Sequence, residues 1–181
     1  MHRFQWHRNL YVIGSIGALW FALACLPALA ADAGKSAPVK IAVFDFELED
    51  ASPSAALPGE SGASAAIMQQ VSSEARRVLA QSGRYSLVDV SKVDATPVTQ
   101  KSLRYCNGCE NRIALQLGAE QSFVGVVRRV TLTEYYVLVQ ISDARTGKVL
   151  NQQSAAFSGG DDAWASGVRM LIQHGVLAAQ D

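Results

Sequence analysis

Apolar positions recur along this chain with two different periods, and these periods predict its strands and helices. Residues 39–46 form a nearly continuous apolar run rich in branched and aromatic side chains, as is typical of a strand covered on both faces. Between residues 63 and 81, apolar side chains recur every three or four positions, and Gly83 follows where a helix needs a left-handed cap. Together with a short strand at 85–90, the first half predicts a β-α-β unit.

The second half of the pattern predicts a short helix, an antiparallel meander and a final helix. Residues 110–117 have one apolar helical face, which Gly118 ends. Three strands joined by links short enough to force hairpins follow, at residues 121–131, 134–142 and 149–157. A last helix starts at the capping carboxylate of Asp161 and runs through Val176. The order β-α-β-α-β-β-β-α indicates a single α/β domain with a mixed sheet of about five strands.

The amino-terminal stretch predicts a cleaved secretory signal peptide. It begins with Arg3 and Arg8, continues as an apolar segment and ends in a small-x-small cleavage site at residues 28–30. We therefore expect a periplasmic protein without a membrane span after cleavage. The leader would occupy residues 1–30, a flexible lead-in residues 31–38, and one domain residues 39–181. Two alternatives stay open: the apolar segment remains as a membrane-spanning helix, or Cys25 is acylated as a lipid anchor.

The mature chain predicted in this way offers few groups for catalysis or for binding anionic polymers. It keeps 14 of the 16 basic residues against 16 acidic ones, a net charge of −2, so it has no basic field for nucleic acid or anionic lipid. His174 is its one histidine and Trp164 its one tryptophan. We expect Trp164, Tyr135 and Tyr136 to serve in packing, and no catalytic residue, cofactor or metal ligand is assigned.

Two cysteines remain after the leader, spaced as Cys106-Asn107-Gly108-Cys109 just before a predicted helix. In an oxidising envelope such a pair tends to form a disulfide, and we predict a structural bridge. The alternative is a thiol-disulfide redox centre in which Cys106 attacks and Cys109 resolves, because a helix start stabilises a thiolate. A thioredoxin fold is disfavoured, since no proline follows Pro97.

Metal and haem binding by the same pair meet chemical obstacles. Glu110 follows the second cysteine, where covalent haem would need a histidine. A closed zinc site needs four ligands, and only His174 and scattered carboxylates could complete one.

Acidic residues gather at the end of the first predicted strand. They are Asp45, Glu47, Glu49 and Asp50, and they lead into a segment, residues 47–61, whose two prolines predict an exposed loop. Ligands often bind at the carboxyl ends of strands in open α/β sheets, so this loop is a candidate partner or ligand surface. A hard cation such as calcium could bind there, but the spacing follows no known calcium loop, and a solvated loop is the alternative.

Several segments together resemble an uncharacterised family of secreted proteobacterial proteins. The resemblance rests on residues 40–48, 83–89, 106–110, 117–119 and 143–149, and the Cys-Asn-Gly-Cys segment is its most specific part. More distantly, the chain is similar to the amino-terminal domain of TolB and to CsgG and LpoB. That resemblance implies binding of protein partners, or assembly in the envelope, rather than catalysis.

Two hypotheses of different classes follow. The first is a non-catalytic periplasmic binding or assembly protein of the cell envelope, which would contact an envelope protein through a free edge strand in the antiparallel half and through the acidic loop. The second is a thiol-disulfide redox protein that acts through Cys106 and Cys109. A third is binding of a metal ion or small ligand at the acidic loop.

Overall fold

The structure is a computed structural model that describes residues 37–53, 55, 60–92 and 102–178. The predicted leader therefore lies outside the described residues, and so do residues 93–101, which follow the second predicted strand. None of the described helices has the length and apolar character needed to span a bilayer.

One mixed sheet and three helices make up the described part of the chain. The strands are β1 (Val39–Val43), β2 (Glu47–Asp50), β3 (Tyr85–Leu87), β4 (Gln121–Arg129), β5 (Glu134–Asp143) and β6 (Val149–Ser158). The helices are α1 (Glu60–Gln81), α3 (Cys109–Gln116) and α4 (Trp164–Leu171), which continues as a π-helical segment, Ile172–Leu177. The strand order is β3-β1-β4-β5-β6, and β2 also pairs with β4. Because β1, β2 and β3 pair in parallel and β4, β5 and β6 antiparallel, the predicted mixed α/β fold is confirmed.

The sheet has one strand more than the sequence predicted, because β2 forms where an exposed loop was expected. β1 and β2 follow one another along the same side of β4, which is nine residues long and extends beyond the five residues of β1. The free length of β4 is paired with β2, from Glu47 opposite Val126 to Asp50 opposite Arg129. Leu48 packs against the main core. Glu47, Glu49 and Asp50 therefore belong to a strand, in which Glu49 and Asp50 point to opposite faces of the sheet, whereas Asp45 precedes this strand.

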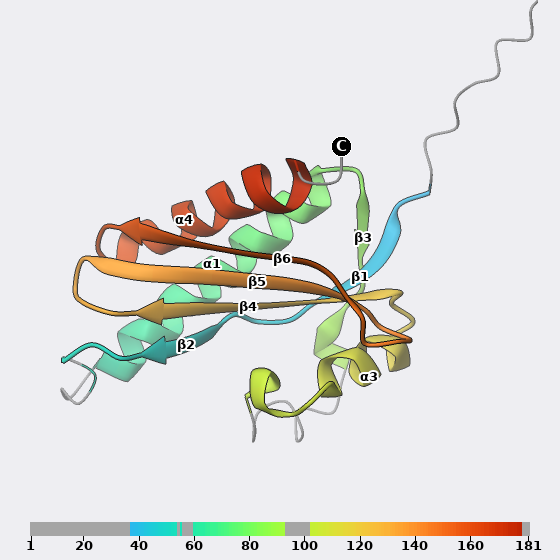
Figure 1. Ribbon diagram of the computed structural model, residues 1–181, viewed down its shortest axis with the longest axis horizontal. Coiled ribbons are helices and arrows are strands. Elements are labelled where there is room, and N and C mark those ends of the chain that lie inside the picture. Colours follow the sequence, from blue (N-terminus) through green and yellow to red (C-terminus); the bar gives the residue numbers. More distant parts are fainter. Residues whose placement is uncertain (1–36, 54, 56–59, 93–101, 179–181) are drawn as a thin grey trace, which may run out of the picture. The chain divides into compact units, whose positions relative to one another are not determined.

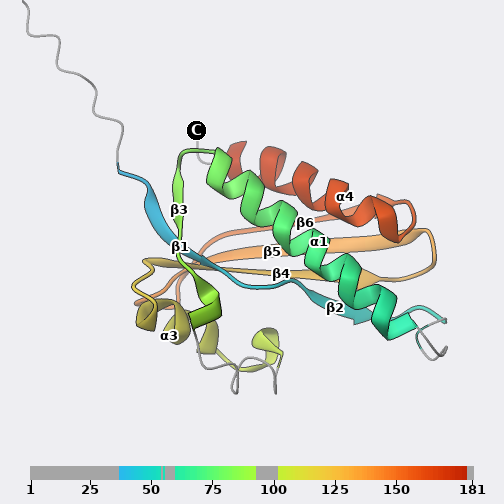
Figure 2. The same ribbon diagram turned by 180° about the vertical axis from the view of Figure 1, so that it is seen from behind.

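Helices α1 and α4 lie side by side on one face of the sheet and enclose the main core (Figure 1). Alternate strand residues such as Ile41, Val43 and Phe123 point into this core. Helix α3 lies on the opposite side, near β1 and β3, and covers a smaller core that contains Ala42 and Phe44 (Figure 2). We call the face under α1 and α4 the closed face. Beyond α3 and the turn before it, the surface of β2, β4, β5 and β6 on the same side as α3 carries no described α-helix, and we call it the open face.

Tyr135 shows how tightly the closed face is packed. Its ring stacks on Phe157 with centroids 5.6 Å apart and lies 5.9 Å from the ring of Trp164. Its hydroxyl donates a hydrogen bond of 3.0 Å to the carbonyl oxygen of Ala163. A Cβ at Gly167 would overlap the Tyr135 ring, so a residue without a side chain lets α4 approach β5 closely.

A buried guanidinium joins the end of β4 to β2 and to the start of the last helix. The side chain of Arg129 is 2% exposed, pairs with Asp50, and lies 3.1 Å from a carboxylate oxygen of Asp161. Its guanidinium carbon is 5.7 Å from the centre of the Trp164 ring. The hydrogen bond from Arg129 lowers the pKa of Asp50 from 3.8 to about 2. A charge is tolerated inside the domain here because it is paired and hydrogen-bonded.

Candidate functional site

The two cysteines close a tight turn at the start of α3. Cys106 and Cys109 form a disulfide with Cα atoms 5.6 Å apart, which is the usual spacing. Between them Asn107 and Gly108 both have positive φ, 53° and 89°. Asparagine and glycine are the residues that adopt this left-handed conformation most readily. The Asn-Gly pair is therefore explained by the turn that the disulfide spans.

The surroundings of the sulfurs fit a structural bridge better than a reactive thiol. Cys109, the first residue of α3, is buried, whereas Cys106 is half-buried and precedes the helix. The Cys106 Sγ lies 2.9 Å from the carbonyl oxygen of Leu103 and 3.8 Å from a carboxylate oxygen of Glu110. Both oxygens carry negative charge density and would disfavour a thiolate at Cys106. The sulfur assigned to attack in the redox hypothesis thus faces two oxygen acceptors.

The same turn holds a three-residue group of metal-ligating types. Ligand atoms of Cys106, Cys109 and Glu110 lie within 4.8 Å of one another. Both sulfurs are bonded to each other, and His174 lies in the C-terminal helix, on the opposite side of the sheet. A zinc site would need free thiolates and a fourth ligand, so this geometry does not favour one.

Glu110 is the most unusual charged group of the turn. The residue is only 8% exposed, and its Oε1 accepts a hydrogen bond of 3.1 Å from Asn111 Nδ2. Asn111 is fixed in turn by the Ser122 hydroxyl, which donates to its Oδ1 at 2.6 Å. The other oxygen of Glu110 faces a disulfide sulfur, which has no hydrogen to donate. The buried carboxylate therefore has no cation partner among the described residues.

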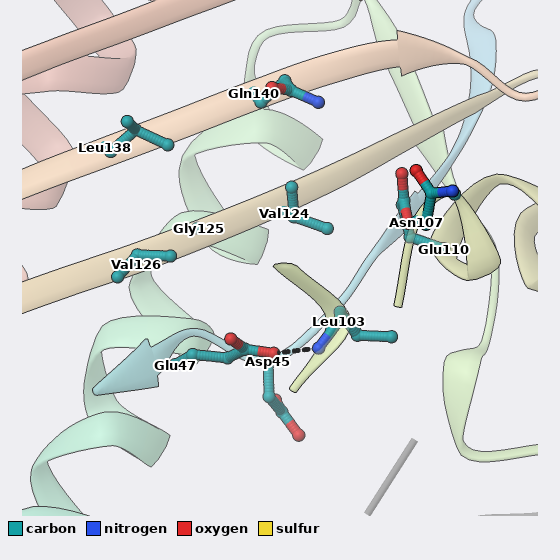
Figure 3. Close-up of a pocket in the computed structure, with 11 residues that line it drawn as sticks. Asp45, Glu47, Leu103, Asn107, Glu110, Val124, Gly125, Val126, Leu138 and Gln140 are labelled. Atoms are coloured by element: carbon teal, nitrogen blue, oxygen red, sulfur yellow. Dashed lines mark hydrogen bonds between the residues drawn. The ribbon is translucent and has the colours of Figure 1, made fainter. Parts of the chain in front are cut away.

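A cavity of about 160 Å³ lies between this turn and the sheet (Figure 3). Glu110 and Asn107 stand at its α3 end, and Glu47 and Leu103 form the side next to β2. The carboxylate of Glu47 accepts hydrogen bonds from the Leu103 amide and the Ser102 hydroxyl, which fasten the segment before the disulfide to β2. The sheet side is apolar except for one glutamine, and is lined by Val124, Gly125, Val126, Leu138 and Gln140.

The structure separates the four acidic residues that the sequence placed in one loop. Asp45 and Glu47 line the cavity, and Asp45 also pairs with Arg76 at 2.7 Å. Glu49 lies on the open face, 3.5 Å from Arg128. Asp50 lies on the closed face, where it pairs with buried Arg129. The alternation of β2, which the sequence did not predict, sends Glu49 and Asp50 to opposite faces, and Asp45 lies before this strand.

Beyond the cavity, the open face forms a wider hollow of about 680 Å³ over β2, β4, β5 and β6. Tyr136 is 51% exposed and Leu138 is 36% exposed, and both line it together with Val126, Arg128 and Ser154. Of the two tyrosines for which sheet and core packing was predicted, Tyr135 lies in the core and Tyr136 lies on the exposed side of the sheet. The sequence signal was limited to the adjacent positions of Tyr135 and Tyr136 on one predicted strand, which place their side chains on opposite faces.

Comparison with protein-family models supports the predicted membership of an uncharacterised family. Residues 39–176 match the model of a family, DUF3280, described as "Protein of unknown function (DUF2380)". No curated protein matches the chain.

Several solved structures show a limited likeness to the chain. The LpoB C-terminal domain from Salmonella enterica has a TM-score of 0.48 and 16% identity, over 71% of this chain and 88% of that one. A PelC dodecamer from Paraburkholderia phytofirmans gives 0.46 and 14%, over 77% and 87%. Lipoprotein GNA1162 from Neisseria meningitidis gives 0.43 and 17%, over 79% and 97%. Structural similarity at these TM-scores and sequence identities gives no evidence about function.

Proposed function

We propose that this chain, which belongs to the family described as "Protein of unknown function (DUF2380)", is a non-catalytic binding protein of the cell envelope. The observation that carries the proposal is the open face. Large apolar side chains lie exposed there, on a sheet whose other side is packed against two helices. Contiguous apolar surface of this kind marks protein interaction sites. The expected ligand is therefore another protein.

Tyr136 and Leu138 would be the main contacts. They are two positions apart on β5 and so point to the same side of the sheet. Tyrosine is enriched at protein interfaces because it offers a large apolar ring and a hydroxyl that can form hydrogen bonds. Because β5 is paired with a strand on each side, the two side chains stand on a rigid support.

The charge around the cavity indicates the character of the partner. Asp45, Glu47 and Glu110 line the cavity, and Glu110 is buried with no cation beside it in the part of the chain that the structure describes. A lysine or arginine side chain could lay its apolar stem along Val124 and Leu138 and bring its charge to Glu110. We therefore expect the partner segment to carry a basic residue next to apolar ones.

Two features support an envelope location. The chain begins with a stretch that predicts an export signal, and the domain contains a disulfide. Disulfides persist in oxidising compartments and are rare where cellular thiols are kept reduced.

Site-specific photo-crosslinking in intact cells tests the proposal. A crosslinking amino acid at Leu138 should give a covalent adduct with a discrete partner protein, and the same amino acid at Ala80 should give none. Ala80 is the matched control because it is exposed on α1, away from the open face. Adding Tyr136→Ala should reduce the adduct at position 138 about tenfold, as loss of an interface contact worth about 1.4 kcal/mol does.

Two results would contradict the proposal. One is the absence of any adduct from position 138 under conditions in which the variant is exported and folded. The other is an identical set of adducts from positions 138 and 80, which would show random collision rather than a binding face.

A further inference from the structure

The sheet has three outer edges in the described part of the chain, and they are protected to different degrees. β3 is only three residues long. β2 has four residues, three of them acidic. β6, from Val149 to Ser158, is ten residues long and contains no charged residue and no proline. Short edges and charged edges are the usual ways in which proteins prevent pairing with another strand, and β6 has neither protection.

The backbone of β6 is unpaired on its outer side. β6 pairs with β5 along its length, and no described segment forms backbone hydrogen bonds with its other side. Alternate amide and carbonyl groups of a strand point to each side, so about half of those in β6 face outward. Its side chains on the open face are exposed, and the chain at its start exposes Val149 and Leu150 by 44% and 46%. This edge can therefore accept a strand.

We propose that β6 pairs antiparallel with β6 of a second copy of this chain. In an antiparallel pair of identical strands, each residue faces a residue of the same strand across the two-fold axis, so charges of one sign within that strand come close together and repel. Every other described strand longer than three residues carries at least one charge, whereas β6 carries none over ten residues. β6 is thus the long strand of this sheet that can meet its own copy without repulsion.

The polar side chains of β6 suit the same partner. Gln152 and Ser154 lie exposed on the open-face side, and Ala156 follows at the next position of that side. Amide and hydroxyl groups both donate and accept hydrogen bonds, so Gln152 and Ser154 can pair with whichever of these side chains faces them across the two-fold axis. A partner strand selected by charge would find no complementary group on β6, which favours a second copy over a charged partner.

Antiparallel pairing has a consequence for the open face. The two-fold axis of such a pair is perpendicular to the sheet, so both copies present their open faces on the same side. The two β5 strands would then be separated by three strand spacings, about 14 Å. Tyr136 and Leu138 of each copy would border one continuous surface. The pairing itself depends only on β6 and holds whether or not the proposed partner of the open face exists.

The test compares the oligomeric state of the natural chain with two charge variants. The chain, expressed with its own leader and purified as cells process it, should have twice the mass of one chain by light scattering. A variant with Gln152→Lys, Ser154→Lys and Ala156→Lys should be a monomer, and so should the corresponding three-glutamate variant. An equimolar mixture of the two variants should restore the dimer, because any nearby antiparallel register places lysine beside glutamate.

A matched control separates the effect of position from that of charge. Three lysines at Gln69, Ser73 and Ala80, all exposed on α1, change the net charge in the same way and should leave the dimer intact. All variants are first compared with the natural chain by circular dichroism and thermal unfolding. Hydrogen exchange on the unmodified chain provides a measurement that needs no variant, since amides of β6 should exchange more slowly at concentrations that favour the dimer.

Four results would overturn the proposal. They are a monomeric natural chain at its highest attainable concentration, a dimer that survives the three β6 lysines, a mixture of lysine and glutamate variants that stays monomeric, and β6 amides whose exchange does not depend on concentration. A partner captured at the open face by a monomeric chain would overturn this inference and leave the proposed function standing.

Discussion

The two faces of the sheet are built from the same kinds of side chain and use them differently. Along β2, β4 and β5, neighbours of one chemical type point to opposite faces, as in the pairs Glu49 and Asp50, Arg128 and Arg129, and Tyr135 and Tyr136. Asp50, Arg129 and Tyr135 lie on the closed face, where each is hydrogen-bonded. Their neighbours lie on the open face and are at least partly exposed. Burial, and not residue type, therefore decides which side chains hold the fold and which are available to a partner.

The largest expected contrast is between the two tyrosines. Tyr135→Ala should lower the free energy of unfolding by about 4 kcal/mol, because it removes a buried ring and a satisfied hydroxyl from the closed face. Tyr136→Ala should change it by less than about 0.5 kcal/mol, because half of that side chain is already in water. Urea unfolding followed by the fluorescence of Trp164 measures both. Equal losses from the two variants would mean that the two faces do not differ in this way.

The two arginines should give a smaller contrast of the same kind. Arg129→Leu should destabilise the domain by about 3 kcal/mol, because Asp50 and Asp161 lose the cation that compensates their burial. Arg128→Leu should cost less than about 1 kcal/mol, because its pair with Glu49 is exposed to solvent. The same urea titration measures the free energy of unfolding of both variants. An Arg128 variant as unstable as the Arg129 variant would contradict the expected difference.

The disulfide should contribute less than the buried arginine. Replacing both Cys106 and Cys109 by serine should cost at most about 2 kcal/mol, since the bridge closes a loop with a sequence separation of only 3. The loss should be local, so amides of α3 should exchange faster while those of α1 and α4 change little. We expect the reduction potential of the pair to lie below about −300 mV, as for structural bridges. A potential near that of oxidoreductases would favour the redox hypothesis instead.

The parts of the fold that the sequence predicted are those set by local periodicity. The apolar repeat of α1 and the short links between β4, β5 and β6 were sufficient, because they act between residues close together in the sequence. β2 could not be predicted in this way. Its sequence, Glu-Leu-Glu-Asp, contains one apolar residue, and its partner Arg129 is 79 positions away from Asp50. The strand exists because β4 needs a partner along its full length, which is a tertiary requirement.

Only part of the candidate site could be predicted from the sequence, for a related reason. The sequence singled out the cysteine turn and the acidic residues, and the structure brings Glu47 and the residues of the turn to one cavity. The exposure of Tyr136 and Leu138 could not be predicted, because alternation shows that two faces differ but does not show which face a helix covers. That choice depends on where α1, α3 and α4 pack, and their apolar faces alone do not specify it.

The smallest expected contrast is between the contributions of the ion pairs of Asp50 and Glu49 to stability. The pKa of Asp50 is about 2 in the folded chain, against an ordinary value of 3.8, because Arg129 donates hydrogen bonds to its carboxylate. A carboxyl whose folded pKa is depressed stabilises the fold fully above its unfolded pKa and loses this contribution as pH falls through the folded value. The natural chain should therefore lose about 1 to 2 kcal/mol from this group between pH 4 and pH 2.

Two variants isolate that contribution from the other carboxyl groups. Asp50→Asn is less stable than the natural chain near neutral pH, and the difference between them should shrink as pH falls from 4 to 2, because only the natural chain has this carboxylate to protonate. Glu49→Gln, on the open face, should lower the free energy of unfolding by less than about 1 kcal/mol near neutral pH, because its ion pair with Arg128 is exposed to solvent. Urea unfolding at a series of pH values measures the three curves. A gap between Asp50→Asn and the natural chain that stays constant from pH 4 to pH 2 would contradict an acid-sensitive ion pair of Asp50 on the closed face.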